Sequence, residues 1–505
     1  MLTVFRRFSR IAQAALALYG SAAAGTLAAD ETPFRKDPYV LHTGVHHSSS
    51  DKDSVVFRHT IHVPGAVWLR LTLSDYALGQ ASFISIRSVQ TGAMQSMTAV
   101  ALETWHNNTA FFGGDTLEFE LHVAPGERNI FAQLSEVWVG LPTDPDAPGP
   151  ANGGDAPEDL CGADNRVASS DPRVGRIFGS GCTAWLVANG AFVTAGHCVD
   201  GDPDGFGPML PDGIVDNGFL NTVVEFNVPS SSSNGVPQPA LPQDQYPVSG
   251  LYVAFQHPGE APNFDSIGVD WAVFHVGPNA NGVTPQQAQN SFFRVSGAAS
   301  STVGQTMRVT GYGLDWTPNG TGGAGAACCD FNSDNNCDFI CNAQSYTEQT
   351  STGVCTDFVD NGSRAWFQYE VDTTPATSGS PVIREANGEA LGINTNSGCS
   401  NGGNYGTTFD QDVLHDFLNE YIYGPGVEYA DAASYCGPPL PFGCSGTIFN
   451  PHDTIPAAVA DVADGANIVI IPGNYTAANG NVFTAGADGK AMTLRAPFGG
   501  VVIGN

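Results

Sequence analysis

The chain is poor in basic residues. Lys and Arg total 19, against 50 Asp and Glu, and the formal net charge of the 505 residues is −31 at pH 7. A surface of this sign repels phosphate groups. The composition therefore argues against a nucleic acid or an anionic membrane surface as the partner.

Long apolar runs are also scarce. One candidate, Ile11–Tyr19, follows three arginines and precedes the small residues Ser21–Gly25. It is well short of the roughly 20 residues that a membrane-spanning helix needs. The order basic, apolar, small is typical of a secretory signal, so we expect residues 1–28 to be a signal peptide cleaved after Ala24 or Ala28. The alternative is a membrane anchor; after signal removal we expect no membrane span.

Stretches with the period of a helix are few, whereas Gly (60) and Pro (33) are abundant. This composition predicts a mainly β, loop-rich protein. The length predicts about three domains. Eleven cysteines in an exported chain are expected to form disulfides rather than remain reduced.

Residues 30–140 carry the pattern of β-strands. In 67–73 and 117–123, apolar residues alternate with others at a period of two. Turn signals such as Pro64-Gly65 and Pro125-Gly126 separate these stretches. We predict a β-sandwich-like domain, which serves either as an accessory module or as a prodomain.

Residues 141–160 are rich in Pro, Gly and Asp and predict a linker. The next domain is predicted to span 161–436. In the final segment, 437–505, a short helical stretch and an apolar strand ending at Pro472-Gly473 precede further short strands. This order resembles the first coils of a parallel β-helix, which are too few to bury a core alone. We expect the segment to dock on the preceding domain, pair with another chain or be incomplete; a generic β tail is the alternative.

Three local motifs within 161–436 carry the residue types of nucleophilic catalysis. His197 lies in T-A-G-H-C, Asp270 enters the apolar strand V-D-W-A-V, and Ser378 lies in T-S-G-S-P. A hydroxyl becomes a good nucleophile when an imidazole takes its proton, and a buried carboxylate must hold that imidazole in the right tautomer. The rival base is His257, which lacks the neighbouring cysteine of His197.

These motifs, with G-C-T-A-W-L at 181–186 and V-T-G-Y-G at 309–313, resemble those of the trypsin-like serine proteases. Among these proteases, the motifs are similar to those of the bacterial secreted branch that includes the glutamyl endopeptidases. The resemblance covers about half of the chain. It implies a chymotrypsin-like double β-barrel, with His197 as general base, Asp270 as its orienting partner and Ser378 as nucleophile. It also implies protein or peptide substrates, no cofactor, and a secreted protein of bacterial origin.

The small residues around Ser378 let the backbone N–H groups of Ala376 and Ser378 face one point, as in an oxyanion hole. The family usually has Gly where Ala376 stands, and Ala disfavours positive φ. Thr377 stands where animal-type zymogens carry an Asp that pairs with a freshly cut N-terminus, so we do not expect activation to use that ion pair. The Ala at position 376 motivates a second hypothesis. In it, the chain is a catalytically weak or inactive protease-fold binding or adhesion protein at the cell surface.

The predicted substrate pocket contains Asp372, Thr373 and Asn394. Asp372 stands where trypsins carry the carboxylate that binds Arg or Lys, although glutamyl endopeptidase relatives can also carry Asp-Thr there. Asn394 stands where those relatives use a His to bind an acidic side chain. A neutral amide lacks that charge, so strong Glu specificity is not expected and the residue preference stays open.

The cysteines allow two expectations. Cys182 and Cys198 flank a predicted hairpin at Asn189-Gly190, and a bridge between them could pin the loop that carries His197. Nine cysteines then remain. Because nine is odd, at least one of them is free or bonded to another chain.

An insertion after residue 323 holds a weak candidate for a calcium site. Asp330, Asn332 and Asp334 have the alternating spacing of a calcium loop. The Gly at the sixth place and the acidic twelfth residue are both missing. A disulfide-stapled loop is therefore favoured, and no metal is expected.

Overall fold

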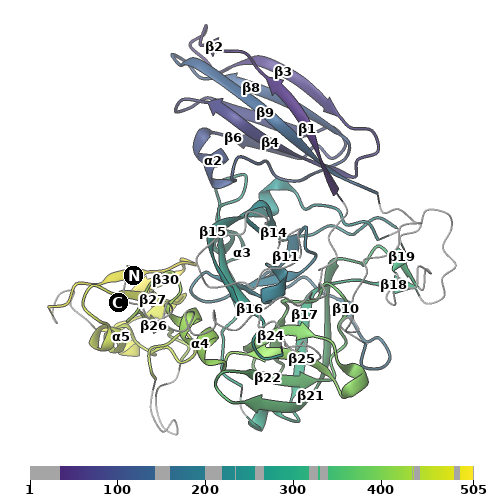
Figure 1. Cartoon of the computed structure of the whole chain (residues 1–505). Coiled ribbons are helices and arrows are strands. Elements are labelled where there is room, and N and C mark those ends of the chain that lie inside the picture. Colours follow the sequence, from purple (N-terminus) through teal and green to yellow (C-terminus); the bar gives the residue numbers. More distant parts are fainter. Residues whose placement is uncertain are drawn as a thin grey trace, which may run out of the picture.

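The computed structural model describes residues 34–142, 160–199, 219–233, 235–255, 267–298, 300–317, 328–329, 339–434, 436, 444–482 and 489–503. The predicted signal peptide, most of the predicted linker, His257 and the calcium candidates Asp330, Asn332 and Asp334 lie outside these residues. Within them the chain is mainly β, as predicted, with an N-terminal sandwich, two barrels and a C-terminal parallel unit (Figure 1). None of the described helices is long and apolar enough to cross a membrane.

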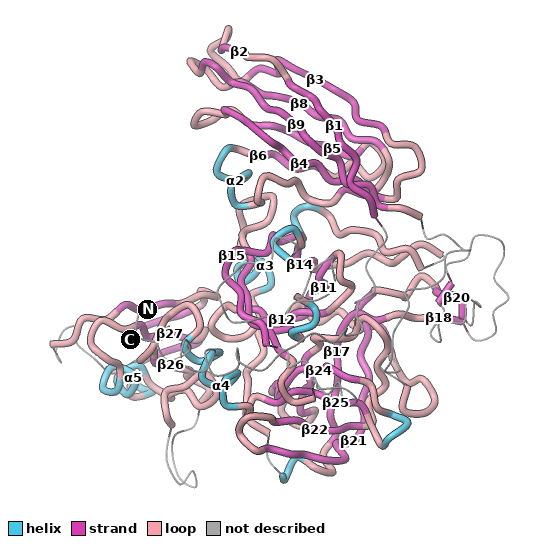
Figure 2. The backbone as a smooth tube through the Cα atoms, in the orientation of Figure 1, coloured by secondary structure: helices cyan, strands magenta, loops and turns pink. Residues whose placement is uncertain are grey.

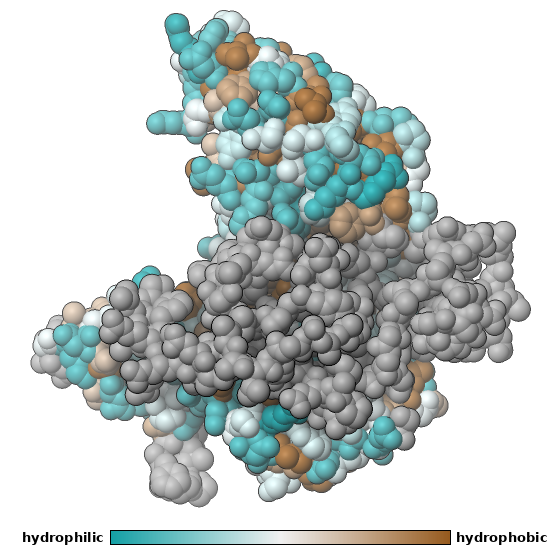
Figure 3. Space-filling view, viewed as in Figure 1, coloured by the Kyte–Doolittle hydropathy of each residue, from teal (hydrophilic) through white to brown (hydrophobic). Residues whose placement is uncertain are grey.

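Two antiparallel sheets form the N-terminal sandwich. The first has the order β1-β9-β4-β7, with β2 also on β9, and the second has the order β3-β8-β5-β6. The bounds are β1 Phe34–His42, β2 His46–His47, β3 Ser54–His62, β4 Trp68–Ala77, β5 Phe83–Ser88, β6 Met94–Met97, β7 Phe112–Gly113, β8 Thr116–Val123 and β9 Arg128–Gly140, with helix α2 at Ala99–Thr104. In β8 the predicted alternation holds, because Leu117, Phe119 and Leu121 are buried and Glu118 is exposed. Figure 3 shows mainly hydrophilic side chains over the visible face of the sandwich, with small hydrophobic patches between them.

Strand β4 departs from simple alternation. Trp68 and Arg70 are as deeply buried as Leu69 and Leu71 on the opposite face. The first barrel covers this second face: the rings of Trp68 and Phe178 pack edge to face with centroids 5.6 Å apart. Sequence periodicity finds the face that points into a domain, but it does not find a face that another domain covers.

Hydrogen bonds continue the same interface. The side chain of Gln245 accepts a hydrogen bond from the Phe111 N–H at 2.9 Å and donates one to the Phe111 carbonyl at 2.8 Å. The buried guanidinium of Arg70 donates to the carbonyl of Asn221. Val223 of the barrel belongs to the apolar core of the sandwich. The sandwich and the first barrel therefore share one continuous packed interface.

The first barrel is closed by six strands in the order β11-β12-β13-β16-β15-β14. Their bounds are β11 Val174–Phe178, β12 Thr183–Leu186, β13 Phe192–Thr194, β14 Val223–Glu225, β15 Gln245–Phe255 and β16 Trp271–Val276. The predicted hairpin is present: Trp185 pairs with Val193, and Gly190 in the turn has φ +85°, a conformation that Gly adopts without strain.

The second barrel has the strand order β10-β21-β17-β23-β24-β25-β22. Pairing of β21 with β22 closes six of these strands into a ring, and β10 adds to β21 from outside. The bounds are β10 Val167–Ala168, β17 Thr306–Gly313, β21 Thr347–Asp360, β22 Ala365–Tyr369, β23 Pro381–Arg384, β24 Ala390–Asn396 and β25 Asn404–Thr408. The predicted chymotrypsin-like double β-barrel is therefore confirmed (Figure 2).

Short elements join and decorate the barrels. A small three-stranded sheet has the order β18-β20-β19. The bounds are β18 Trp316–Thr317, β19 Cys328–Cys329, β20 Phe339–Cys341, α3 Pro285–Gln289 and α4 Asp412–Glu420, with single 3₁₀ turns at Gly196–Cys198, Phe219–Asn221, Pro242–Asp244, Ser300–Thr302, Cys399–Asn401 and Ala477–Asn479.

The C-terminal unit is built from parallel strand pairs, as successive coils of a β-helix would be. Strands β26-β27-β29 form one sheet and β28-β30 another. The bounds are β26 Glu428–Ala430, α5 Ile455–Asp461, β27 Asn467–Ile470, β28 Gly473–Tyr475, β29 Thr493–Arg495 and β30 Val501–Ile503. Its first strand thus comes from residues 428–430, upstream of the boundary at 437 expected from the sequence.

This unit docks on the first barrel, one of the three outcomes expected from the sequence. Phe498 lies in the apolar core of that barrel, and its ring is 4.7 Å from that of Phe292. Arg294 forms an ion pair with the buried Asp431, at 2.6 Å. The coils therefore bury their apolar side against the barrel instead of standing alone.

Candidate active site

Local pairing in the first barrel brings His197 and Asp270 together. His197 lies on the 3₁₀ turn that follows β13, and Asp270 directly precedes β16. Strands β13 and β16 are antiparallel neighbours, with Thr194 opposite Ala272. The end of one strand and the start of the other therefore meet at the same edge of the barrel.

The contact between the two side chains has the geometry of a base held by its orienting carboxylate. Asp270 is fully buried, and the His197 side chain is 11% exposed. One carboxylate oxygen of Asp270 accepts the backbone N–H of His197 at 3.0 Å, and the other lies 2.6 Å from Nδ1 of its ring. An ionised carboxylate at Nδ1 requires the proton there, which leaves Nε2 as the basic nitrogen.

The predicted disulfide between Cys182 and Cys198 is present, with the two Cα atoms 6.0 Å apart. It joins the start of the β12 hairpin to the turn that carries His197. The sulfur atoms also lie close to the His197 ring. Because both are bonded to each other, neither can serve as a thiolate ligand for a metal.

The loop that carries Ser378 is tied to the same hairpin. The Ser378 carbonyl accepts the N–H of Thr183 at 2.9 Å, and the Gly379 carbonyl accepts the indole N–H of Trp185 at 3.0 Å. Gly379 has φ +86°, and a Cβ added to it would lie 2.2 Å from oxygen atoms of Thr183 and Thr194. Only Gly lets the loop approach the strand that leads into His197 this closely.

Ala376 adopts the backbone conformation that the sequence marked as difficult for it. Its φ is +77°, and the residue is buried. Among the described residues, nothing accepts a hydrogen bond from its N–H. Ala is strained in this region by about 1–2 kcal/mol, and interactions of the surrounding fold offset this strain.

The three predicted pocket residues are buried, and each makes contacts inside the protein. Both carboxylate oxygens of Asp372 accept backbone N–H groups, from Cys161 at 2.7 Å and Asn165 at 2.8 Å. The hydroxyl of Thr373 accepts a hydrogen bond from another buried side chain. The amide of Asn394 accepts the hydroxyl of a tyrosine at 2.5 Å and donates to the carbonyl of residue 377 at 3.3 Å.

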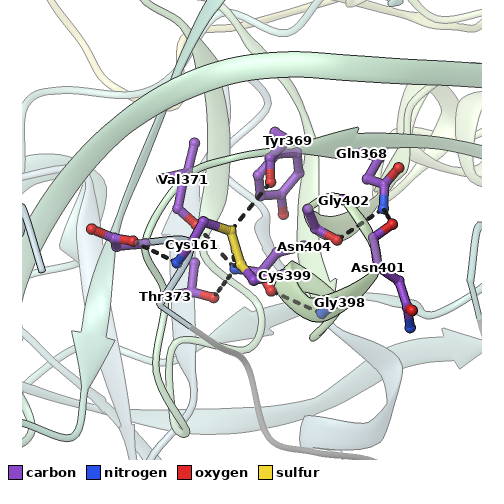
Figure 4. Close-up of a disulfide and its surroundings, with 12 residues drawn as sticks. Cys161, Gln368, Tyr369, Val371, Thr373, Gly398, Cys399, Asn401, Gly402 and Asn404 are labelled. Atoms are coloured by element: carbon purple, nitrogen blue, oxygen red, sulfur yellow. Dashed lines mark hydrogen bonds between the residues drawn. A yellow bond between two sulfur atoms is a disulfide. The ribbon is translucent and has the colours of Figure 1, made fainter. Parts of the chain in front are cut away.

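A second disulfide lies beside this loop and was not found from the sequence. Cys161 and Cys399 are bonded although 238 residues separate them. Figure 4 shows the bridge among side chains of the second barrel, with Asn404 donating to the carbonyl of Val371 and the hydroxyl of Thr373. From the sequence, nine cysteines remained after Cys182 and Cys198 were assigned, and their pairing could not be deduced.

Three other described cysteines are placed by their side chains. Cys436 and Cys444 form a further disulfide, and Cys355 is free and buried, in agreement with the expectation of at least one unpaired thiol. Burial raises the pKa of the Cys355 thiol to about 11, which keeps it protonated and unreactive at neutral pH.

One family model matches part of the chain. Residues 182–393, which include His197, Asp270 and Ser378, match the family model of the trypsin-like peptidase domain. No curated protein matches the chain.

Solved structures with low sequence identity align with about half of the chain. A Glu endopeptidase is 17% identical over 53% of this chain and 96% of its own, with a TM-score of 0.30. The VesB protease of Vibrio cholerae is 12% identical over 52% of this chain and 70% of its own, with a TM-score of 0.31. Human heparin binding protein is 14% identical over 52% of this chain and 99% of its own, with a TM-score of 0.32.

Proposed function

We propose, from the premise that residues 182–393 form a trypsin-like peptidase domain, that this protein is a secreted serine endopeptidase. The observation that carries the proposal is the paired contact of buried Asp270 with the backbone and ring of His197. Burying the carboxylate of Asp270 beside His197 costs free energy. The role that explains this arrangement is proton acceptance by His197 at Nε2.

In the proposed reaction, Oγ of Ser378 attacks the carbonyl carbon of the peptide bond while Nε2 of His197 takes the hydroxyl proton. The N–H groups of Ala376 and Ser378 stabilise the negative charge on the carbonyl oxygen. The C–N bond then breaks, and His197 returns the proton to the leaving amine. Water, activated by His197, hydrolyses the acyl-enzyme and restores Ser378.

Asp372, Thr373 and Asn394 are proposed to support the wall of the substrate pocket. Their polar atoms are engaged by the protein itself, so none presents a free charge to a substrate side chain. A trypsin-like preference for Arg or Lys is therefore not expected from Asp372. Profiling with a peptide library measures the preference directly.

Covalent labelling by a fluorophosphonate probe tests the function without knowledge of the substrate. An activated serine oxygen displaces fluoride and forms a stable bond to phosphorus. We expect the wild type to be labelled at Ser378, and the variants Ser378→Ala and His197→Ala to remain unlabelled. Ser380→Ala is the matched control, since it removes a buried hydroxyl two residues away and is expected to label like the wild type.

The competing function has a clear signature in the same experiment. A protease-fold binding or adhesion protein would fold with the same disulfides, yet neither the intact nor the linker-cleaved protein would react with the probe. That result would overturn the endopeptidase proposal. Secretion is tested separately, by mass spectrometry of the exported protein for loss of residues 1–24 or 1–28.

A further inference from the structure

A short segment upstream of the first barrel lies against the loop that carries the nucleophile. Residues Cys161–Arg166, which we call the strap, are anchored at both ends. Cys161 is bonded to Cys399, and immediately after the strap the strand β10 pairs with β21 of the second barrel. The strap is thus part of the second barrel, although the family match begins only at residue 182.

The first point of contact is the beginning of the nucleophile loop. Asp372 is 4% exposed, and its carboxylate accepts the N–H groups of Cys161 and Asn165. The side chain of Asn165 accepts the hydroxyl of Ser351 and donates to the carbonyl of Thr352 at 3.2 Å. The two N–H bonds to the Asp372 carboxylate hold the strap and Asp372 in one arrangement.

The second point of contact is the guanidinium of Arg166, which is 4% exposed. Its Nη1 donates to the carbonyl of Leu314 at 2.6 Å and to the hydroxyl of Thr374 at 2.8 Å. Its Nε and Nη2 donate to the two carboxylate oxygens of Asp164, at 3.0 and 2.8 Å. Burial raises the pKa of the Asp164 carboxyl, but the hydrogen bonds and charge of Arg166 outweigh burial and hold that pKa below its usual range.

The groups that Arg166 contacts brace the turn that contains Ala376. The Thr374 carbonyl accepts both the N–H of Thr377, at 3.0 Å, and its hydroxyl, at 2.7 Å. The N–H of Leu314 donates to the Pro375 carbonyl at 2.9 Å. A strained residue with φ +77° persists only where the residues around it are held. Arg166 contacts Thr374 of this turn directly, and it contacts Pro375 only through Leu314.

We propose that Arg166 is a positioning residue that keeps the turn at 374–377 in the conformation required by Ser378. Its guanidinium, which is paired with Asp164 of the strap, donates hydrogen bonds to this turn from within the chain, where animal-type zymogens use a freshly cut N-terminus. Thr377 fits this role, since it makes a local turn in place of the Asp that would pair with such an N-terminus. The inference rests on the proposed function, because the turn it organises is the one that would stabilise the oxyanion.

The rate of fluorophosphonate labelling of the full-length protein tests the inference. We expect Arg166→Ala to label about 10- to 100-fold more slowly, as misplacement of catalytic groups by about 1 Å typically does. Guanidinium ion at low millimolar concentration should restore a large share of that rate by filling the vacated position. Arg166→Lys should lie between the two, because an ammonium can donate to Thr374 or Leu314 but not to both with the same geometry.

Arg308 provides the matched control. It lies on β17 of the same barrel and pairs with Glu385 at 2.8 Å, away from the turn. Arg308→Ala and Arg308→Lys should label like the wild type and show no response to guanidinium. Thermal unfolding of every variant reports whether it is folded.

The possible results separate the two proposals. Wild-type labelling with an equal rate in folded Arg166→Ala would overturn the positioning role alone, as would guanidinium acceleration of the Arg308 control. If Arg166→Ala does not fold, Arg166→Lys decides: a wild-type rate overturns the role, and a slower rate at an unchanged unfolding temperature supports it. Absence of labelling in the wild type would overturn the proposed function and the positioning role with it.

Discussion

The indole of Trp68 in the N-terminal sandwich packs edge to face against the ring of Phe178 in the first barrel, with centroids 5.6 Å apart. Both side chains are buried, and Phe111 packs on both of them. Phe178 belongs to the core of the sandwich and not to that of its own barrel. An interface of this kind resembles the interior of one domain more than a transient contact between two.

This interface predicts that the sandwich stays bound to the rest of the protein after the linker is cut. With a cleavage site for a specific protease inserted within residues 143–159, the two fragments should co-elute in size-exclusion chromatography after cutting. Phe178→Ala removes a barrel side chain that lies in the core of the sandwich, worth about 3–5 kcal/mol, and should release the sandwich. Phe83→Ala is the control and should leave the fragments together. It removes a ring that stacks on His122 within the second sheet of the sandwich, which does not contain Trp68. Separation of the wild-type fragments would instead identify a prodomain.

Replacing Asp270 by Asn should nearly abolish the reactivity of Ser378. An amide N–H facing Nδ1 favours the wrong tautomer of His197, and in the Ser-His-Asp template this change lowers kcat by about 10⁴-fold. The labelling rate measures the loss, with the exposed Asp416→Asn as the control. A rate within tenfold of the wild type would show that His197 is not oriented by Asp270 during the reaction.

Ala376→Gly should stabilise the protein by about 1 kcal/mol, because it relieves Ala of a positive φ by more than Gly adds in unfolded-state entropy. The urea midpoint measures the change. Ala132→Gly, in the buried strand β9, should have the opposite sign, since Gly there adds only a cavity and entropy. A decrease for Ala376→Gly would mean that the methyl group makes contacts worth more than the backbone strain.

Stability should fall as the pH rises from about 5 to about 8, in part because of Glu348. Burial raises the pKa of this carboxyl to about 7, despite hydrogen bonds from Ser169 and Asp171 and the charge of Arg173, which lower it. In this window the folded state binds a proton that the unfolded state releases, so ionisation favours unfolding. Glu348→Gln should flatten the decline by about 1–3 kcal/mol, measured by urea unfolding at both pH values. Parallel pH profiles for the two proteins would contradict the assignment.

Much of the site could be predicted from the sequence because its parts are local. The hairpin around Asn189-Gly190, the turn with His197 and the short reach from Cys182 to Cys198 depend on residues close together along the chain. Alternation likewise predicted the inner face of β8. The residue types needed for acyl transfer are few, so His197, Asp270 and Ser378 could be proposed from three motifs.

Tertiary structure decided the features that join distant segments. It paired Cys161 with Cys399 across 238 residues, left Cys355 unpaired and buried, and bonded Asp372 to the backbone of the strap. It also buried Trp68 on the face that periodicity leaves open. In each case the partner lies on another element, and the side chain's own neighbours in sequence are compatible with several partners. The sequence by itself thus determined which chemistry the chain can carry and the local turns that present it. Only the packing of sandwich, strap and barrels, where burial and long-range hydrogen bonds select one partner among many, decided what holds that chemistry in place.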